Sequence, residues 1–269
     1  MPGRLVCVGV GLRADAHVSP EVAAYVRAAD RVAYLAANVM MASWIHTANP
    51  NAESLERFYA PGKLRRDTYR EILAYLLEHV RGGANVCYAL YGHPGVFSFV
   101  AHKAIRLLRA EGIEAFMLPA ISAEDCLFAD LGVDPGDHGC NSYEATDFLV
   151  HDRIADVTSP LILWQIGAIG NVRDFSSPAV RPVSILIEEL IARYGAGHEV
   201  VVYEASPHPI MAPVMKRVAL GTMSWRDVTA MSTLYVPALR RPALNLAMVE
   251  RLGLTSDLAD PEFSEEVRA

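Results

Sequence analysis

The chain has 269 residues, of which 52% are hydrophobic and 20% are charged, and its formal net charge at pH 7 is -7. This much apolar surface indicates a folded protein with a large core, not a disordered one, and the length suits about two domains. The negative balance provides no overall attraction for phosphate backbones or anionic lipids, so neither nucleic acid nor a membrane surface is expected as a partner.

Targeting and redox signals are also missing from the sequence. The longest apolar runs fall far short of the roughly 20 residues that a membrane helix needs, and no small-residue cleavage pattern follows the apolar segment Leu5–Leu12. We therefore expect a cytoplasmic protein. The cysteines at positions 7, 87, 126 and 140 show no C-x-x-C spacing, so neither a disulfide scaffold nor a zinc site is expected.

The first part of the chain alternates strand and helix patterns. Ser19-Pro20 offers an N-cap and an N1 proline, and apolar residues between Tyr69 and Val80 recur at helical spacing. The expected strands are 5–10, 31–35, 86–90 and 113–118, and the expected helices are 19–29, 69–80 and 100–111. Such alternation predicts a parallel α/β sheet.

A break at Pro119 begins a second unit. Ser122 and Asp125 form a capping-box pattern that opens a helix ending near Leu131. The remaining expected elements are strands 141–143, 161–166, 200–203 and 233–236 and a helix 183–193, with mixed strand pairing. We expect domains at 1–118 and 119–240, followed by a tail at 241–269 that is partly helical and then frayed from Ser256.

Two familiar motifs do not hold up in their contexts. Gly9-Val10-Gly11-Leu12-Arg13-Ala14 fits the dinucleotide pattern G-x-G-x-x-A, but the helix that should begin inside it waits until Ser19, and Asp30 precedes the second strand instead of ending it. The cluster Asp134, Asp137, His138 and Cys140 lies in a turn with mixed donor types, so no metal is expected.

The loop Tyr91–Phe97 follows a buried strand at its carboxyl end, where open α/β sheets bind ligands. It contains two glycines around a proline, and a plain strand-to-helix turn is an equally good interpretation. His93 in this loop could be a base or a hydrogen-bonded scaffold residue.

Arg65 and Tyr69 are four residues apart and share a helix face, with Tyr59 in the preceding loop. A guanidinium beside a phenol favours the phenolate, which would make Tyr69 a usable base; an exposed Arg-Tyr pair is the alternative. Gln165 within an expected apolar strand needs a partner, either backbone or ligand, and Ser232-Thr233 leaves the same choice.

Four segments together resemble the borosin peptide α-N-methyltransferases, which have the tetrapyrrole methylase-like fold. They are Tyr91-Gly92-His93-Pro94-Gly95-Val96-Phe97, Ile121 to Leu131, Ser142-Tyr143-Glu144-Ala145 and Leu163-Trp164-Gln165. The similarity spans about Leu5 to Pro237. It implies an α/β protein of two α/β domains that binds S-adenosylmethionine in the cleft between them.

The resemblance also implies site residues at matching positions. The catalytic residues would be Tyr69, Arg65, Tyr59 and Tyr91. The cofactor-binding residues would be Tyr91, His93, Val96, Phe97, Ser122, Ala123, Tyr143, Gln165, Ala205, Ser232 and Thr233. The implied reaction is repeated N-methylation of backbone amides, with Tyr69 taking the amide proton and Tyr59 or Tyr91 donating to the carbonyl oxygen.

Departures from the family pattern refine the expectation. In the tetrapyrrole methylases that this chain resembles, the loop that here contains His93 has the pattern Gly-Asp-Pro, and the position of Pro119-Ala120 has Pro-Gly. These two differences argue against a macrocyclic substrate. Glu56 stands where the fused fungal enzymes have an aromatic residue. The chain ends 32 residues after Pro237, so we expect a precursor peptide supplied in trans, as in the split bacterial members of the family. The resemblance also implies a homodimer, which would form a heterotetramer with two precursor chains.

Two other functions stay open at the level of sequence. The same fold could methylate a tetrapyrrole, another small molecule or an RNA. A binding module that senses S-adenosylmethionine without converting it is the non-enzymatic alternative.

Overall fold

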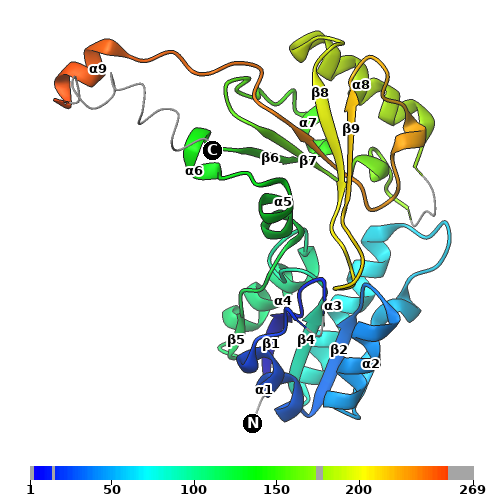
Figure 1. Ribbon diagram of the computed structural model, residues 1–269. Coiled ribbons are helices and arrows are strands. Elements are labelled where there is room, and N and C mark those ends of the chain that lie inside the picture. The colour runs from blue at the N-terminus through cyan, green and yellow to red at the C-terminus, as the bar shows by residue number, and fades with distance from the viewer. Residues whose placement is uncertain (1–2, 14–15, 174–177, 254–269) are drawn as a thin grey trace.

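The computed structural model describes residues 3–13, 16–173 and 178–253, which form two sheets with their own helices (Figure 1). The first sheet has five parallel strands in the order β3-β2-β4-β1-β5. They are β1 (Arg4–Gly9), β2 (Arg31–Leu35), β3 (Ala52–Ser54), β4 (Asn85–Leu90) and β5 (Ala115–Met117). The parallel sheet predicted for this half is confirmed.

Helices cover both faces of the first sheet. They are α1 (Pro20–Ala28), α2 (Val39–Ala48), α3 (Arg65–Arg81) and α4 (Phe99–Ala110), with the short 3₁₀ turn η1 (Leu55–Phe58) before α3. Val22 of α1 and Met41 of α2 pack on one face of the sheet, and Ile72 of α3 and Ala104 of α4 pack on the other. Alternate strand residues therefore bury into two separate apolar layers.

Local signals explain most of these boundaries. The Ser19 side chain accepts a hydrogen bond from the Val22 amide and Pro20 is the first helical residue, as predicted. Helix α3 begins at Arg65, earlier than the predicted Tyr69, so its first turn carries the arginine and the tyrosine on one face. The sequence pattern missed α2 and β3, because α2 exposes Val39 and Met40 and so lacks a clear polar face.

The second sheet has five strands in the order β6-β7-β10-β8-β9. They are β6 (Asn141–Glu144), β7 (Leu161–Trp164), β8 (Glu199–Glu204), β9 (Val214–Ala219) and β10 (Thr233–Val236). Strands β6 and β7 are parallel, and the other pairs are antiparallel. The mixed pairing predicted for this half is confirmed, although the edge strand β9 was not predicted, because its side chains are mostly exposed.

Helices also lie on both faces of the second sheet. The helices and 3₁₀ turns of this half are α5 (Ala123–Leu131), α6 (Pro135–His138), α7 (Ala145–Val150), η2 (Ile166–Ala168), α8 (Val180–Tyr194) and η3 (Trp225–Asp227). Leu127 of α5 packs beneath β7 and β8, whereas Phe148 of α7 and Leu186 of α8 pack on the opposite face. The predicted capping box is present, because Ser122 and Asp125 each bind the other's backbone amide.

The prediction of a strand over 161–166 is wrong at its end. Strand β7 stops at Trp164, and Gln165 has the left-handed φ of 58° that turns the chain into η2. Gln165 is only half-buried, so it is not the buried amide of an apolar strand that the sequence suggested. Its backbone amide and carbonyl are therefore released from the sheet for the turn.

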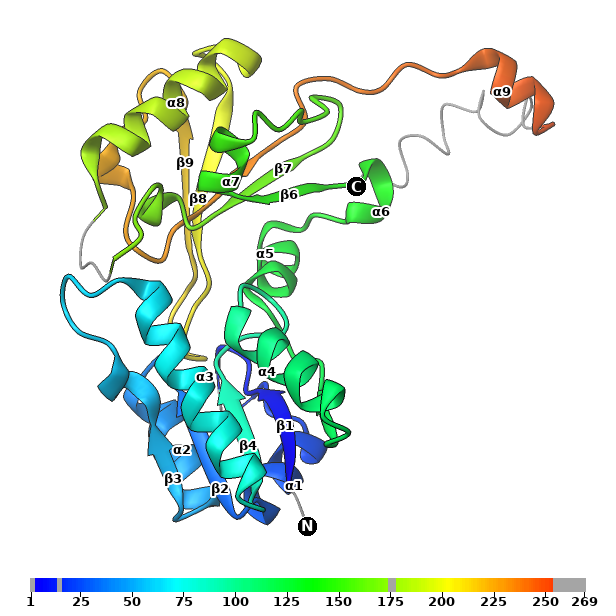
Figure 2. The same ribbon diagram turned by 180° about the vertical axis from the view of Figure 1, so that it is seen from behind.

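After β10 the chain leaves the second sheet as an extended arm that ends in α9 (Leu246–Arg251) (Figures 1 and 2). No residue of α9 is buried. The helix agrees with a partly helical tail, and the predicted frayed stretch 256–269 lies outside the described residues. Over the part of the chain that is described, no helix is both long and apolar enough to cross a bilayer.

Candidate active site

A cavity of about 790 Å³ takes its walls from both halves of the chain. From the first half it is lined by Leu12, Leu35, the loop residues Tyr59 to Pro61, Arg65, Tyr69, Tyr88 and residues 90–93 and 96–100. From the second half it is lined by Ser122, Ala123, Glu124, Trp164, Gln165, Ala168, Ala230, Met231 and Thr233. Its size and its mixed aromatic and polar walls are typical of cofactor and small-ligand sites.

Gly9 and Gly11, at and just after the end of β1, hold the loop after β4 in place. Gly11 and Gly92 form an antiparallel bridge, in which the Gly92 amide donates to the Gly11 carbonyl at 2.8 Å. A Cβ on Gly9 would lie 2.3 Å from the Gly92 carbonyl oxygen and 2.7 Å from Cδ of Pro94. Gly9 and Gly11 therefore allow the end of β1 to lie close to the loop after β4. They do not form the dinucleotide-binding turn that their spacing suggests.

Two histidines fix the shape of the same loop. The His93 Nδ1 accepts a hydrogen bond from the Gly95 amide at 2.9 Å, and the His102 Nε2 lies 2.8 Å from the Gly95 carbonyl oxygen. Phe97 then adopts a left-handed φ of 50°, which is rare for a residue with a side chain. The histidine that was considered as a base thus binds its own loop in this structure, and its predicted role in cofactor binding is unchanged.

Four tyrosines and an arginine gather at one end of the cavity. Tyr69 and Arg65 come from the start of α3, Tyr59 from the preceding loop, Tyr88 from β4 and Tyr91 from the loop after it. Loss of solvent raises the pKa of Tyr91, the neighbouring Tyr69 raises it further, and the Arg65 guanidinium lowers it. Tyr91 therefore keeps its proton at neutral pH and can donate a hydrogen bond into the cavity.

Tyr88 was not singled out in the sequence. It is 2% exposed, and burial holds its pKa well above the ordinary value, with Tyr59 next in effect. The alternation of β4 could have found it, since Val86, Tyr88 and Leu90 point to the face covered by α3. A neutral phenol at this depth supports the walls around Tyr59 and Tyr69.

The second half contributes the opposite wall. Ser122, Ala123, Gln165 and Thr233, all predicted from the sequence, line the cavity. They come from the start of α5, the turn after β7 and the first residue of β10. This placement brings four predicted side chains from distant parts of the sequence to one surface.

Three predicted cofactor residues do not line this cavity: Tyr143, Ala205 and Ser232. The Tyr143 ring packs against Phe148 with centroids 5.9 Å apart, and Ala205 packs beside the α5 cluster. Ser232 is fully buried, and its hydroxyl donates to Oε1 of Glu204 at 2.7 Å.

The walls also contain aromatic and apolar residues that sequence reasoning passed over. Trp164, Phe99 and Met231 line the cavity. Phe99 stacks on Tyr69 with ring centroids 6.2 Å apart. Trp164 stood inside the quoted Leu-Trp-Gln segment, but period-two alternation alone cannot say that a strand's last residue faces a ligand.

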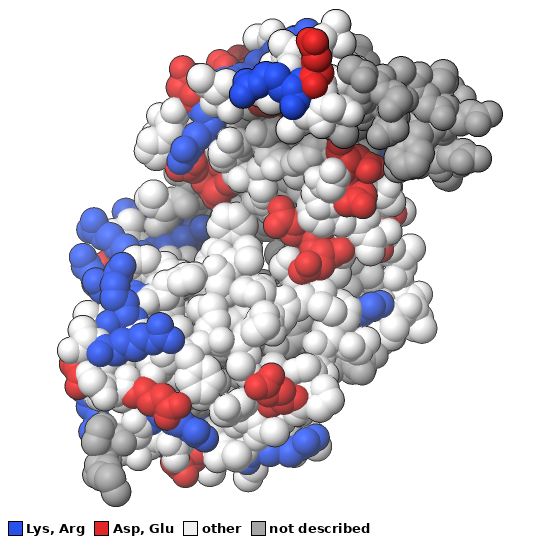
Figure 3. Space-filling view, turned by 90° about the vertical axis from the view of Figure 1, so that its left-hand side faces the viewer, with Lys and Arg blue, Asp and Glu red and all other residues white. Residues whose placement is uncertain are grey.

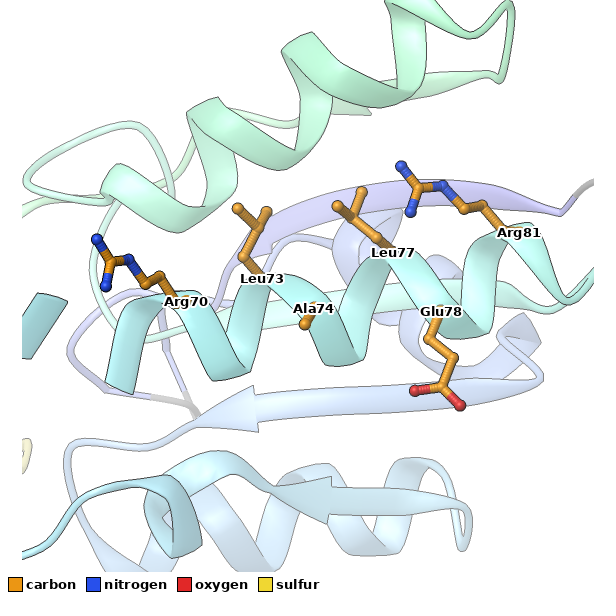
Figure 4. A pocket seen from close by; sticks show the side chains of 6 residues that line it. All are labelled: Arg70, Leu73, Ala74, Leu77, Glu78 and Arg81. Atoms are coloured by element: carbon orange, nitrogen blue, oxygen red, sulfur yellow. The ribbon is translucent and has the colours of Figure 1, made fainter. Parts of the chain in front are cut away.

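A second hollow, of about 550 Å³, lies along the outer side of α3 (Figure 4). Leu73 and Leu77 point toward α4, and Arg70 and Arg81 stand at its two ends. The Arg81 guanidinium is engaged by Glu111 at 2.6 Å. None of the residues predicted to be catalytic lines this hollow, so the chemistry is assigned to the larger cavity.

The chain is similar to known proteins in both sequence and fold. The model of the Tetrapyrrole (Corrin/Porphyrin) Methylases matches residues 4–206. A crystal structure of uroporphyrin-III-C-methyltransferase from Thermus thermophilus matches with a TM-score of 0.63 and 17% identity, over 94% of this chain and 97% of that one. The fold expected from the sequence is confirmed.

Two curated relatives are more similar in sequence. The methyltransferase/ribosomally synthesized cyclic peptide dendrothelin A precursor of Dendrothele bispora is 37% identical over 93% of this chain and 61% of its own length. The methyltransferase/ribosomally synthesized type I borosin cyclic peptide precursor of Coprinopsis marcescibilis is 38% identical over 96% of this chain and 68% of its own length. The chain thus spans about two thirds of these relatives.

Proposed function

Because the chain belongs to the tetrapyrrole (corrin/porphyrin) methylase family, as a relative of the borosin methyltransferases, we propose that it transfers methyl groups to backbone amide nitrogens of a peptide. The observation that carries this proposal is the gathering of Arg65, Tyr69 and Tyr91 at one end of a cavity that spans both halves. A base, a cation and a neutral donor are what amide alkylation requires.

S-adenosylmethionine is the proposed methyl donor, and the cavity fits it. The volume of about 790 Å³ suits a nucleoside with an amino acid side chain. Phe97 and Trp164 offer apolar surface, and the polar groups of Gln165 and Thr233 offer hydrogen bonds. When bound, the cofactor supplies an electrophilic methyl group on a sulfonium.

The substrate class is proposed from the relatives and from the site. The names of both relatives join a methyltransferase to a ribosomally synthesized cyclic peptide precursor. In a peptide bond the nitrogen lone pair is delocalised into the carbonyl, so the nitrogen is a poor nucleophile until it loses its proton or its carbonyl is polarised. The tyrosine-lined end of the cavity supplies groups for both tasks.

In the proposed mechanism Tyr69 accepts the proton of the amide nitrogen, and Arg65 stabilises the phenolate that does so. Tyr91, whose raised pKa keeps it protonated, donates to the carbonyl oxygen as negative charge builds there, with Tyr59 as a second donor. The deprotonated nitrogen would then be the nucleophile for the methyl group that bound S-adenosylmethionine would supply, with S-adenosylhomocysteine as the other product. Repetition along one peptide is natural, since each residue presents another amide.

The partners expected from the sequence are also part of the proposal: a separate precursor chain, a homodimer and a heterotetramer with two precursors. The arm after β10 exposes Leu239, Leu244, Leu246 and Leu252, and its helix α9 lies away from the body of the molecule (Figure 1). One face of the molecule has few charged groups over its middle, with Lys and Arg along one border (Figure 3). The exposed leucines of the arm are apolar surface that supports association of two copies.

Co-expression with a candidate precursor peptide, followed by mass spectrometry, tests the function. We expect successive additions of one methyl group located on backbone nitrogens. The variant Tyr69→Phe should bind S-adenosylmethionine normally and lose at least about 100-fold in turnover. Tyr25→Phe is the matched control, because Tyr25 packs edge-to-face on Phe116 outside the cavity.

Near wild-type turnover in Tyr69→Phe would remove Tyr69 as the base. Cofactor binding without methylation of any peptide, together with methylation of a tetrapyrrole, would redirect the assignment to the other substrates of the fold. Cofactor binding without turnover on any acceptor would leave a sensing module.

A further inference from the structure

The start of helix α3 is held by the second half of the chain. Leu64 precedes the helix and has no side-chain group that could cap it. The amide of Arg65, the first helical residue, donates instead to the carbonyl oxygen of Val172 at 3.0 Å. An amide that helix geometry leaves without an internal partner is thus satisfied from the other domain.

Arg173 completes this connection. It forms an antiparallel bridge with Leu64, and its Nη1 donates to the carbonyl oxygen of Gly62 at 2.6 Å. Gly62 has a left-handed φ of 76°, so the loop turns sharply where the guanidinium meets it. Both ribbon views show the loop before α3 lying beside the segment that follows η2 (Figures 1 and 2).

The segment that carries Arg173 continues back into the cavity wall. The Arg173 amide donates to Oδ1 of Asn171 at 2.9 Å, and the Asn171 amide donates to the Ala168 carbonyl at 3.0 Å. The Ala168 amide in turn donates to the Gln165 carbonyl at 2.8 Å. Ala168 and Gln165 both line the cavity. An uninterrupted series of hydrogen bonds therefore joins the cofactor side of the cavity to the loop before the catalytic helix.

The loop itself is braced mainly at its other end. The Lys63 ammonium donates to the Phe58 carbonyl at 2.7 Å and pairs with Glu71 at 2.7 Å. The Thr68 hydroxyl donates to the same carbonyl at 3.3 Å. These contacts fix the loop's shape within the first half, but they do not relate it to the opposite wall. Arg173 and the Val172 carbonyl, both within the described residues, are contacts that do so.

We propose that Arg173 is a positioning residue of the methyl transfer: by holding Gly62 it sets where Arg65 and Tyr69 stand relative to the cofactor wall. The inference rests on the proposed function for its kinetic consequence. A displacement of about 1 Å between base and reacting atoms is enough to cost a large part of the rate. The effect is therefore expected in turnover, and not in cofactor affinity.

The test uses the full chain with a peptide that it methylates, and compares Arg173→Met, Arg173→Lys and Arg181→Met. Met keeps the length of the side chain without its donors, Lys keeps one donor for the Gly62 carbonyl, and Arg181 is an exposed arginine on α8. We expect Arg173→Met to lower kcat about tenfold, with the Kd for S-adenosylmethionine within about twofold of wild type. Arg173→Lys should recover most of the loss, and Arg181→Met should match wild type.

A double-mutant comparison separates positioning from general damage. If Arg173 acts through Arg65 and Tyr69, then adding Arg173→Met to Tyr69→Phe should cost little more in single-turnover rate than Tyr69→Phe alone. A full multiplicative loss in the double variant would overturn the proposal. So would unchanged kcat in Arg173→Met, or a loss in Arg173→Lys as large as that in Arg173→Met.

Amide hydrogen exchange provides a readout that needs no substrate. Arg173→Met should speed exchange over residues 62–68 relative to Arg181→Met, because the loop loses its tie to the second half. Unchanged exchange there would refute the tie even in an active enzyme. Absence of any methylation by the wild type, with faster exchange in the variant, would instead refute the proposed function and keep the tie.

Discussion

Phe97 and Trp164 face each other across the boundary between the two halves of the chain, with ring centroids 6.2 Å apart and planes inclined by 56°. Phe97 belongs to the loop after β4, and Trp164 is the last residue of β7. Both residues line the cavity. Phe97 itself has a left-handed backbone conformation, and Trp164 is followed by Gln165, which also has one. The pair joins the two walls by apolar contact where the Arg173 connection joins them by hydrogen bonds.

Trp164 should therefore affect both stability and cofactor affinity. It is 7% exposed, and its indole N–H donates to the Ser142 hydroxyl at 2.7 Å. We expect Trp164→Phe to destabilise the protein by about 1–3 kcal/mol, since it leaves a cavity and removes the hydrogen bond to Ser142. Urea unfolding and calorimetric titration with S-adenosylmethionine check this, with Trp225→Phe as control; equal effects of the two changes would contradict it.

Gly167 is predicted to tolerate no side chain. A Cβ there would lie 2.1 Å from the carbonyl oxygen of Thr229, a backbone atom that cannot move aside cheaply. Gly167→Ala should displace the neighbouring wall at Ala168 and Ala230 and weaken S-adenosylmethionine binding at least about tenfold. Gly197→Ala is the control, since its Cβ would meet open space. Similar affinities in the two variants would show that the wall is not held as described.

Tyr91→Phe tests the proposed donor to the substrate carbonyl. We expect kcat to fall about 10²- to 10³-fold, with little change in cofactor Kd, because one charge-stabilising hydrogen bond is removed from the transition state. The raised pKa of Tyr91 gives the sign of the pH effect: the phenol stays protonated up to and beyond about pH 10, its ordinary range.

The pH profile follows from that sign. Wild-type kcat should show no loss between pH 7 and 9 that is attributable to Tyr91, and Tyr91→Phe should lower the whole profile without altering its shape. A falling limb between pH 7 and 9 that disappears in Tyr91→Phe would contradict the assignment.

Ser232 and Thr233 are adjacent in sequence, but we expect their substitution to affect different properties of the protein. The Ser232 hydroxyl is fully buried and bound to Glu204, and it accepts a hydrogen bond from the Thr229 amide at 2.8 Å. Ser232→Ala should cost about 1–3 kcal/mol of unfolding free energy. Thr233→Val should instead weaken cofactor binding with stability nearly kept, because Thr233 lines the cavity. Thermal unfolding and titration of both variants distinguish the two; a reversed pattern would refute this division.

Much of the architecture was readable from local patterns. The apolar run from Val86 to Leu90, the N-cap at Ser19 and the capping box at Ser122 act over a few residues, so they predicted elements that the structure contains. Elements whose sequences contradict those patterns were missed. The exposed strand β9 and the helix α2, with apolar residues on its outer side, gave no clear periodic signal.

Local patterns likewise predicted some residues of the candidate site but not others. Arg65 and Tyr69 could be paired from their spacing, because one helical turn separates them whatever the rest of the chain does. That Tyr88 and Tyr91 face the same space, that Trp164 ends its strand against Phe97, and that Arg173 holds Gly62 depend on contacts between residues far apart in the chain. No local propensity encodes such distances.

Composition and residue spacing were thus enough for the class of fold, for the helix that carries the proposed catalytic pair, and for the loop at the end of β4, because short-range sterics and hydrogen bonds specify them. Packing of the two halves settled which of the predicted residues share one cavity. It put Ser232 behind the wall and Thr233 in it, and it turned Gln165 out of its strand. These positions arise because side chains from the two halves pack against each other, and this packing forms only once the whole chain has folded.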